Sequence, residues 1–359
     1  MKIIDTLGNS AKTVDTQTSS IPSIQVKSLT KRYGSVVAVR DVSFTVQPGE
    51  IVGFLGPNGA GKSTTMRILS GLMMADSGEA YLCGDSVALH PERAKLRIGY
   101  MPENNPLPED MRVVEYLRYR AQLKSIPIRK RNERINTVME QCDLQRKARR
   151  KLIGALSKGF RQRVGIADAL LAEPDVVIMD EPTIGLDPHQ IKAMRSLITD
   201  LRGKMTVILS SHILPEIEAC CDRVIIINQG EVVAAGDTAS LHREFLQSKR
   251  FKIELIADVE KVRKALQALP KVTDVRVDAA SDAGAFRTLH VDTEMGGPEG
   301  EELLGILSQA GVEKVRSLSP IEPTLEDVFM AATRRSWDEV ADPLSTRDTD
   351  QEPVVSSVD

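Results

Sequence analysis

The stretch GPNGAGKST, residues 56–64, constrains the fold of this chain more than any other segment. It follows the apolar run EIVGFLG, which predicts a short strand, and precedes KSTTMRILSGL, which predicts a helix. Glycines let backbone N–H groups converge on phosphate oxygens, and the start of a helix favours an anion. In this context a chance glycine-rich turn is the weaker interpretation, and the pattern predicts a phosphate-binding loop. Its residues are Gly56, Pro57, Asn58, Gly59, Ala60, Gly61, Lys62, Ser63 and Thr64.

The segments around this loop alternate between apolar runs and helical stretches. DVVIMDEP and MTVILSSH are apolar runs bounded by turns and preceded by helical sequence, which favours parallel strands covered by helices. Before the loop, the sequence predicts strands separated by turns at Gly34 and at residues 48–49. Charged, helix-prone sequence runs from about residue 91, and DRVIIINQGEVVAAG predicts a hairpin at Gln229–Gly230.

A second unit begins near residue 250. Its segments read strand, helix, strand, strand, helix, strand, which is the pattern of a ferredoxin-like α+β fold. After it, Thr324 and Asp327 have the spacing of a capped helix start. The predicted main domain spans 23–242 and contains a helical subdomain at about 91–160. An accessory domain at 250–319 and a helix at 320–335 follow it. The tail at 1–22 and the acidic tail at 336–359 are predicted to be disordered.

Candidate chemical groups follow the predicted strands. Lys62 would supply positive charge to the β- and γ-phosphates, and Ser63 would offer a hydroxyl to Mg²⁺. Asp180 ends an apolar strand and could hold Mg²⁺ through water, while Glu181 could polarise an attacking water. His212 follows the run VILSS, at the sheet edge where ligands bind, and could donate to a phosphate. Two acids that merely end a strand in solvent, and a surface histidine, are the alternatives.

Composition excludes several functions. The net charge of −3 gives no reason to expect a nucleic-acid partner. The four cysteines show no metal spacing, which favours reduced thiols in a cytosolic protein. No apolar run approaches the length that spans a bilayer, so a membrane function would require a partner that supplies the span.

Five motifs in the order GPNGAGKST, LSKGF, VVIMDEP, GLDP and SSH resemble those of the ATP-binding cassette (ABC) ATPases, over about residues 24–240. The resemblance implies an α/β P-loop NTPase cassette with antiparallel β and helical subdomains, which hydrolyses ATP with Mg²⁺. It also implies a head-to-tail homodimer, in which the start of the LSKGF helix contacts the nucleotide held by the second copy. The residues of that signature are Ser157, Lys158, Gly159 and Phe160. Ser157 alone could equally be an ordinary helix N-cap.

The resemblance assigns two further residues. Tyr33 matches the aromatic residue that stacks on adenine, and an ordinary strand-end tyrosine is the alternative. Asp187 matches the residue that communicates across the dimer, although an aspartate before Pro188 also suits a turn.

The sequence departs from the family pattern in the signature, where Lys158 replaces glycine and Phe160 replaces glutamine. Glu103 stands where the family commonly has glutamine. It can still ligate Mg²⁺, but it adds a negative charge beside the phosphates.

The stretches PENNPL and PIEPTLEDVFM are similar to the branch that pairs with ABC-2 type membrane subunits and serves mostly in export. This implies a peripheral protein on the cytoplasmic face of the membrane. Leu107, Met111 and Val113 would either form an exposed apolar docking patch or pack within the helical subdomain. The main alternative function is a soluble ABC ATPase of the ribosome-associated or DNA-repair type, and a small-molecule P-loop kinase is more distant.

Overall fold

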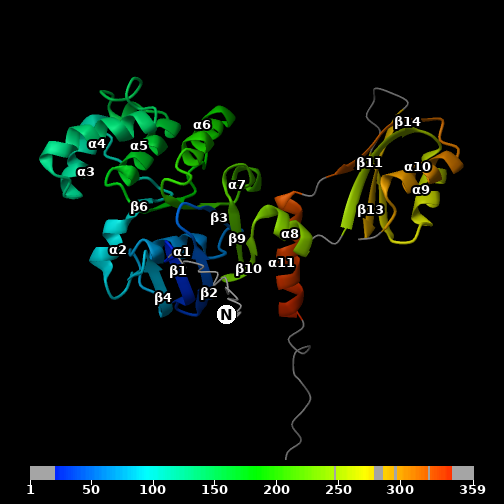
Figure 1. Cartoon of the computed structure of the whole chain (residues 1–359), viewed down its shortest axis with the longest axis horizontal. Coiled ribbons are helices and arrows are strands. Elements are labelled where there is room, and N and C mark those ends of the chain that lie inside the picture. Colours follow the sequence, from blue (N-terminus) through cyan, green and yellow to red (C-terminus); the bar gives the residue numbers. More distant parts are fainter. Residues whose placement is uncertain (1–20, 246–247, 279–285, 295–296, 322–323, 342–359) are drawn as a thin grey trace, which may run out of the picture.

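The computed structural model describes residues 21–245, 248–278, 286–294, 297–321 and 324–341. Figure 1 shows an α/β body formed by the first part of the chain and a smaller unit at the other end of the molecule.

A four-stranded antiparallel sheet forms the outer layer of the body. Its strand order is β2-β1-β4-β5. The strands are β1 Ile24–Tyr33, β2 Val36–Val46, β4 Ser77–Leu82 and β5 Asp85–Ser86. Gly34 lies in the turn between the first two strands with φ 60°, as the sequence predicts.

A six-stranded sheet with the order β10-β9-β3-β8-β7-β6 forms the centre of the body. The strands are β3 Ile51–Leu55, β6 Ile98–Met101, β7 Val176–Asp180, β8 Thr206–Ser211, β9 Arg223–Asn228 and β10 Glu231–Gly236. All pairs are parallel except β9 with β10, which form the predicted hairpin around Gln229–Gly230. Every residue of β3 and β7 is buried, because the sheet is covered on both faces.

The two faces of this sheet line two separate cores. Val176 and Ile178 pack with the antiparallel sheet, whereas Val177 and Met179 pack with the helices of the opposite face. This alternation follows from the period of two in a strand. The helices of the body are α1 Lys62–Leu69, α2 Pro91–Arg97, α3 Val113–Leu123, α4 Ile128–Gln141, α5 Lys158–Leu170, α6 Pro188–Thr199, α7 Leu214–Cys220 and α8 Thr238–Phe245, with a 3₁₀ turn at Ile153–Ala155.

The second unit has the predicted ferredoxin-like order of elements, and its antiparallel sheet runs β12-β13-β11-β14. The elements are β11 Ser248–Ile256, α9 Val259–Gln267, β12 Val272–Val277, β13 Arg287–Glu294, α10 Gly300–Gln309 and β14 Lys314–Ile321. Its core is separate from the two cores of the body.

The last helix, α11 Leu325–Ala341, returns to the body. Its buried residues Leu325, Val328 and Ala332 belong to the same core as α7 and α8, and Figure 1 shows α11 beside α8. The accessory unit is therefore inserted between two helices of the body.

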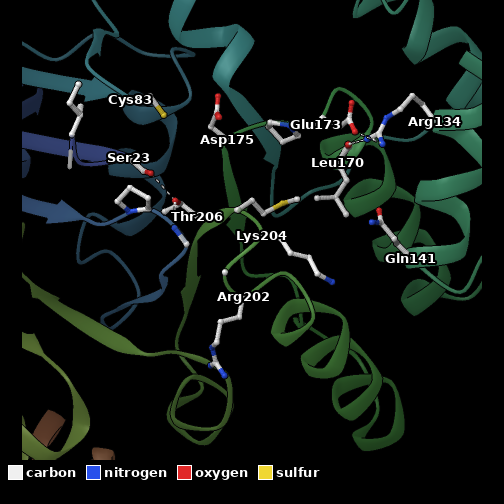
Figure 2. Close-up of a pocket in the computed structure, with 16 residues that line it drawn as sticks. Ser23, Cys83, Arg134, Gln141, Leu170, Glu173, Asp175, Arg202, Lys204 and Thr206 are labelled. Carbon is white, nitrogen blue, oxygen red and sulfur yellow. Dashed lines mark hydrogen bonds and ion pairs between the residues drawn. The ribbon is translucent and has the colours of Figure 1, made fainter. Parts of the chain in front are cut away.

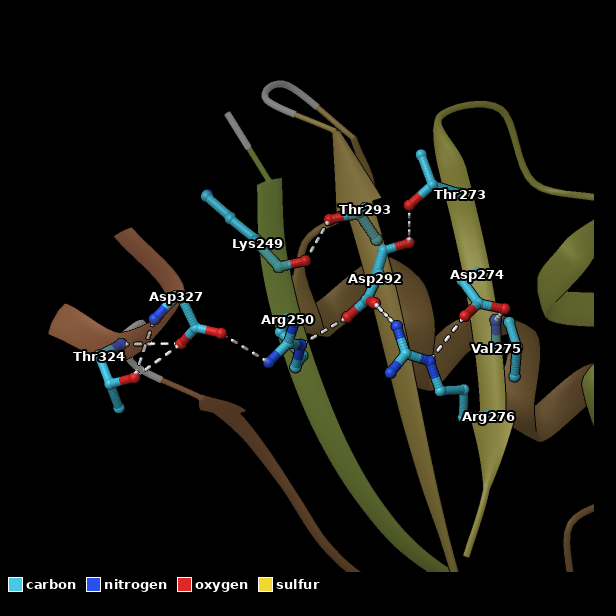
Figure 3. Close-up of polar contacts among 10 residues, drawn as sticks. All are labelled: Lys249, Arg250, Thr273, Asp274, Val275, Arg276, Asp292, Thr293, Thr324 and Asp327. Carbon is cyan, nitrogen blue, oxygen red and sulfur yellow. Dashed lines mark hydrogen bonds and ion pairs between the residues drawn. The ribbon is translucent and has the colours of Figure 1, made fainter. Parts of the chain in front are cut away.

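A ladder of charges links this unit to α11 (Figure 3). The Arg250 guanidinium donates to Asp292 at 2.8 Å and to Asp327 of α11 at 3.5 Å, and Arg276 continues the ladder from Asp292 to Asp274. The hydrogen bond with Asp292 raises the pKa of Arg250, so the guanidinium keeps its charge. The ladder joins the open face of the accessory sheet to the first turn of α11.

Three predicted boundaries are wrong. The helix predicted at 320–335 begins at Leu325, because residues 320–321 still pair with β11 as the end of β14. The stretch assigned to a helical subdomain from about 91 contains β6, which pairs with β7 in the central sheet, because four residues are too short a run to show a strand period. Residues 336–341 continue α11 instead of starting a disordered tail, since no Gly or Pro interrupts the sequence before Pro343. The rest of that tail and residues 1–20 lie outside the described residues.

Candidate functional site

The loop between β3 and α1 has the backbone geometry of a phosphate-binding turn. Gly61 has φ 104°, and a Cβ atom added to it would stand 2.4 Å from the carbonyl oxygen of Ala38. A Cβ atom on Gly56 would stand 2.4 Å from the carbonyl oxygen of Ile227. Only glycine fits at these positions. No side chain caps the start of α1, so the N–H groups of its first turn are available to an anion.

Lys62 lies against this loop. Its side chain is 7% exposed, and its Nζ donates to the carbonyls of Gly56 at 2.8 Å and Pro57 at 3.2 Å. Glu181 Oε1 lies 3.7 Å from the same nitrogen. A buried ammonium needs such partners, and phosphate oxygens arriving at the loop would replace them.

Asp180, at the end of β7, faces the first turn of α1. Its Oδ1 accepts from Ser63 Oγ at 3.3 Å and from Ser210 Oγ at 2.6 Å. Ser210 Oγ also accepts from the backbone N–H of Glu181 at 3.0 Å. A carboxylate and a hydroxyl are ligands that suit Mg²⁺. Among the described residues no group of three or more His, Cys, Asp or Glu side chains could hold a metal ion.

Glu181 and His212 meet at the carboxyl ends of β7 and β8. Glu181 Oε2 lies 2.8 Å from His212 Nδ1, and the two side chains are 7% and 42% exposed. Glu181 has φ 50°, in the left-handed region, where a non-glycine residue is uncommon. Such strain persists where the surrounding structure fixes it and is common at functional sites. This pair can orient a water molecule beside a phosphate.

Lys62, Ser63, Glu181 and His212 line one cavity of about 600 Å³ at the carboxyl ends of the parallel strands. Asp180 is not part of its wall, but it accepts a hydrogen bond from Ser63, which is. Its walls are formed by Ala38, Asn58, Gly59, Gly61, Lys62, Ser63, Thr64, Glu103, Glu181, Ile184 and His212. Glu103 therefore contributes a carboxylate to the wall of this cavity. Nearby, burial and the charge of Asp180 raise the pKa of Tyr100 to about 12, so this phenol stays neutral.

Tyr33 is not brought into this cavity by the structure. It lies at the end of β1, 45% exposed, and its hydroxyl donates to Met73 Sδ at 3.0 Å. Adenine stacking on Tyr33 stays a prediction.

For Leu107, Met111 and Val113 the structure favours packing within the helical subdomain over an exposed docking patch. Val113 is fully buried at the start of α3, and Leu107 and Met111 are partly buried against the same core. These side chains pack within the helical part of the body, which is the alternative that the sequence leaves open.

The signature residues lie outside the cavity walls. Ser157 is the exposed N-cap of α5, and its Oγ accepts from the Phe160 N–H at 3.5 Å, a long contact. Gly159 is buried, and a Cβ atom there would stand 2.5 Å from Gln190 Oε1 of α6. Lys158 reaches over the turn before α6, since a Cβ atom on Gly185 would lie 2.5 Å from its Nζ.

Asp187 stands beside this signature, as the N-cap of α6. Its Oδ1 accepts from the Gln190 N–H at 3.0 Å. The packing of Gly159 on Gln190 therefore places the starts of α5 and α6 next to each other. Ser157, Lys158 and Asp187 are exposed, and none of them lines the cavity at the phosphate loop of the same chain.

A larger cavity of about 760 Å³ lies at the opposite end of the strands (Figure 2). It is bordered by Thr206 at the start of β8 and by Gly49 just before β3. Thr206 Oγ1 donates to Ser23 and accepts from the Gly49 N–H, and Arg134 is paired with Glu173 and the Leu170 carbonyl. These polar groups are satisfied within the fold. Ligands of open α/β sheets bind at the carboxyl ends of the strands, so this cavity is the weaker candidate.

Sequence reasoning missed Ser210. This buried serine holds both Asp180 and the Glu181 backbone in place. Two serines at the end of an apolar strand, before His212, were the available signal, because buried hydroxyls need partners.

Comparison with known proteins gives consistent results. Residues 39–184 match the protein family described as ABC transporter. The chain is 31% identical over 317 residues to the linearmycin resistance ATP-binding protein LnrL of Bacillus subtilis (strain 168), covering 87% of this chain and 99% of that one. It is 40% identical over 221 residues to the Nod factor export ATP-binding protein I of Ralstonia nicotianae (strain ATCC BAA-1114 / GMI1000), covering 60% and 68%.

Solved structures give the same result. A structure of the ATP-binding subunit of an ABC transporter has a TM-score of 0.57 and 34% identity, covering 62% of this chain and 92% of that one. A dimeric bacterial ABC transporter cassette has a TM-score of 0.55 and 25% identity, covering 60% and 98%. Within the described part of the chain, every helix is too short or too polar to cross a membrane.

Proposed function

Because this chain belongs to the ABC transporter family of ATP-binding proteins, we propose that it is the ATP-hydrolysing subunit of an exporter and that it drives a separate ABC-2 type membrane subunit. The observation that carries this proposal is the cavity at the carboxyl ends of β3, β7 and β8. It gathers a phosphate loop and a glutamate–histidine pair, and Ser63 in its wall is hydrogen-bonded to the Asp180 carboxylate behind it. The signature of the same chain lies outside this cavity.

ATP would occupy the cavity with its phosphates on the loop at residues 56–64. Bound Mg²⁺ would neutralise charge on the phosphates. Lys62 would exchange its carbonyl partners for β- and γ-phosphate oxygens, and Ser63 with Asp180 would hold the ion's coordination sphere. Glu103, which lines the same cavity, could add an oxygen ligand.

Hydrolysis requires an oriented water molecule. Glu181 would accept a hydrogen bond from that water, and His212 would hold the carboxylate in position and reach the γ-phosphate. The catalytic contribution is positioning and charge stabilisation, as in phosphoryl transfer generally.

A second copy would complete each site. Ser157 is an exposed N-cap with a long internal contact, so its hydroxyl is free to donate to a phosphate on another molecule. Asp187 lies on the same surface. A head-to-tail pair of chains would place these groups over each other's nucleotides, with two ATP molecules between them.

The exporter assignment rests on the relatives, two of which are named for Nod factor export and for linearmycin resistance. In such a system this chain would lie on the cytoplasmic face of the membrane, bound to its membrane-spanning partner. ATP-driven closure of the pair would be transmitted to that partner.

Trapping of the closed pair tests the proposal. In the Glu181→Gln background, ATP and Mg²⁺ should convert the protein to a species of twice the mass in light scattering. Adding Ser157→Arg should abolish this species while nucleotide binding, followed with a fluorescent ATP analogue, stays intact. A Glu181→Gln protein that stays monomeric at saturating ATP would contradict the shared site. Co-purification with a multi-span membrane protein would then distinguish an exporter from a soluble ABC ATPase.

A further inference from the structure

Thr183 and Glu216 form a buried polar pair just behind the catalytic groups. Thr183 is 4% exposed, Glu216 is 6% exposed, and the threonine Oγ1 donates a hydrogen bond to Glu216 Oε2. The two residues are 33 positions apart in the sequence, so the bond joins two separate segments.

Thr183 lies within the segment from Glu181 to Asp187, two residues after Glu181. The Ile184 N–H donates to the Glu181 carbonyl at 3.2 Å, and the Leu186 N–H donates to the Thr183 carbonyl at 3.2 Å. These two consecutive turns make the segment a compact unit. Fixing Thr183 therefore fixes Glu181 on one side and the start of α6 on the other.

Glu216 lies in the first turns of α7, four residues after His212. Its backbone carbonyl accepts a hydrogen bond from Cys220 Sγ at 3.0 Å. This bond helps to fix the turn of α7 that carries the Glu216 carboxylate. The same segment therefore carries His212 and the acceptor for Thr183. Both partners of the Glu181–His212 contact are attached to the two ends of one buried hydrogen bond.

The Thr183–Glu216 pair does not make a large favourable contribution to the free energy of folding. Glu216 Oε1 is buried and has no hydrogen-bond partner among the described residues, and no ion pair with Glu216 occurs among them either. A buried carboxylate without a cation costs free energy, and an apolar residue of similar volume would be as stable or more stable. The hydrogen bond instead fixes the distance between the segment that carries Glu181 and the segment that carries His212.

We propose that Thr183 and Glu216 are positioning residues which set the catalytic Glu181 against His212. This inference rests on the proposed ATP hydrolysis and deepens it. When the bond is present, the Glu181 carboxylate is held 2.8 Å from the imidazole and faces the phosphate loop. When the bond is absent, the two segments move independently and the attacking water loses its orientation.

The test uses near-isosteric replacements at both ends of the bond, all assayed in the full chain. Thr183→Val removes the donor with little change of shape, and Thr183→Ser keeps it. Glu216→Gln keeps an acceptor oxygen and removes the charge, whereas Glu216→Leu removes the acceptor. Steady-state ATPase kinetics, nucleotide affinity and thermal unfolding midpoints are measured for each variant, with activity assayed well below its midpoint.

We expect Thr183→Val and Glu216→Leu to lower kcat by about 10-fold or more, because small displacements of catalytic groups are costly. Nucleotide affinity should stay within about 3-fold of the wild type, because the phosphate loop is untouched. Thr183→Ser and Glu216→Gln should retain kcat within about 3-fold. Glu216→Gln should also match or exceed the wild-type unfolding midpoint, since it removes a buried charge.

Two results would overturn the inference. One is an unchanged kcat in folded Thr183→Val. The other is a set of kcat values that follows only the folded fraction of each variant, which is the outcome of a purely structural role. If Thr183→Val does not fold, Glu216→Gln and Thr183→Ser decide, because a loss of kcat in either folded variant contradicts positioning by this bond. A wild-type protein that does not hydrolyse ATP would instead contradict the proposed function itself.

Discussion

The Asn105 side chain lies directly over Gly165: a Cβ atom added to this glycine would stand 2.3 Å from Asn105 Nδ2. The same Nδ2 donates to the Arg161 carbonyl of α5 at 2.9 Å. Asn105 follows Glu103 by two residues, and α5 begins directly after Ser157. The loop that carries a carboxylate into one site is thus bound to the helix whose start is proposed to contact the other site.

Gly165→Ala should break this connection. The added methyl would displace Asn105 and cost about 1–3 kcal/mol of unfolding free energy, as overpacking does. The loop bearing Glu103 would shift, and we expect a lower kcat/KM for ATP with a measurable fall in unfolding midpoint. Gly305→Ala is the matched control, because a Cβ atom there meets nothing within 4 Å and α10 should gain up to about 1 kcal/mol of helix propensity. Equal stability changes in the two variants would contradict the close packing at Gly165.

Glu181→Gln should abolish turnover while leaving nucleotide binding intact. The amide keeps the size of the side chain but is a far weaker base and acceptor toward water, so kcat should fall by about 100-fold or more. ATP affinity should change little, because the loop at residues 56–64 is unaltered. Single-turnover hydrolysis and equilibrium binding measure the two effects separately. Rapid steady-state hydrolysis by this variant would exclude Glu181 as the residue that orients water.

Cys142 should make the stability of the protein sensitive to alkaline pH. Complete burial raises the pKa of this thiol from 9.0 to about 12. Below pH 9 the thiol is protonated in both states, and its contribution to stability is fully present. Above pH 9 only the unfolded chain releases the proton, so stability falls as pH rises, by about 1.4 kcal/mol at pH 10.

Urea unfolding of the wild type and of Cys142→Ala at pH 8 and pH 10 isolates this effect. The advantage of the wild type over the variant should shrink between the two pH values, because alanine does not titrate. An advantage that is equal at both pH values would show that the thiolate is tolerated in the folded core.

Leu325→Ala should destabilise the body of the protein and not the accessory unit. Leu325 is fully buried in the core that contains α7 and α8, and such a truncation costs about 2–5 kcal/mol. Met330→Ala, on the exposed side of the same helix, should change stability by less than about 0.5 kcal/mol. Hydrogen exchange of the amides in β9 and β10 would locate the effect. Protection lost only in β11–β14 would contradict the assignment of α11 to the body.

The sequence predicted the parts of this fold that local patterns define. The glycine loop, the fully apolar strands β3 and β7, the hairpin at Gln229–Gly230 and the order of elements in the accessory unit are all present. The positions of Asp180, Glu181 and His212 at one sheet edge follow from strand ends alone.

What local patterns do not define was missed. The strand β6 has only four residues, and it is a strand because it pairs with β7, nearly eighty residues away in the sequence. Val113 carries no signal that distinguishes an exposed apolar residue from a buried one. The bond between Thr183 and Glu216 joins two segments that only tertiary packing brings together. These features depend on long-range contacts, which one sequence does not reveal.

The return of α11 to the body changes how the accessory unit can be removed. A protein cut after α8 would lose Leu325, Val328 and Ala332 and would leave bare the apolar surface formed by Leu241 and Phe245. Loss of activity in such a protein would report aggregation or unfolding and would say nothing about the accessory sheet. An informative deletion must excise β11 to β14 and rejoin α8 to α11 through a short linker, as one would remove a loop.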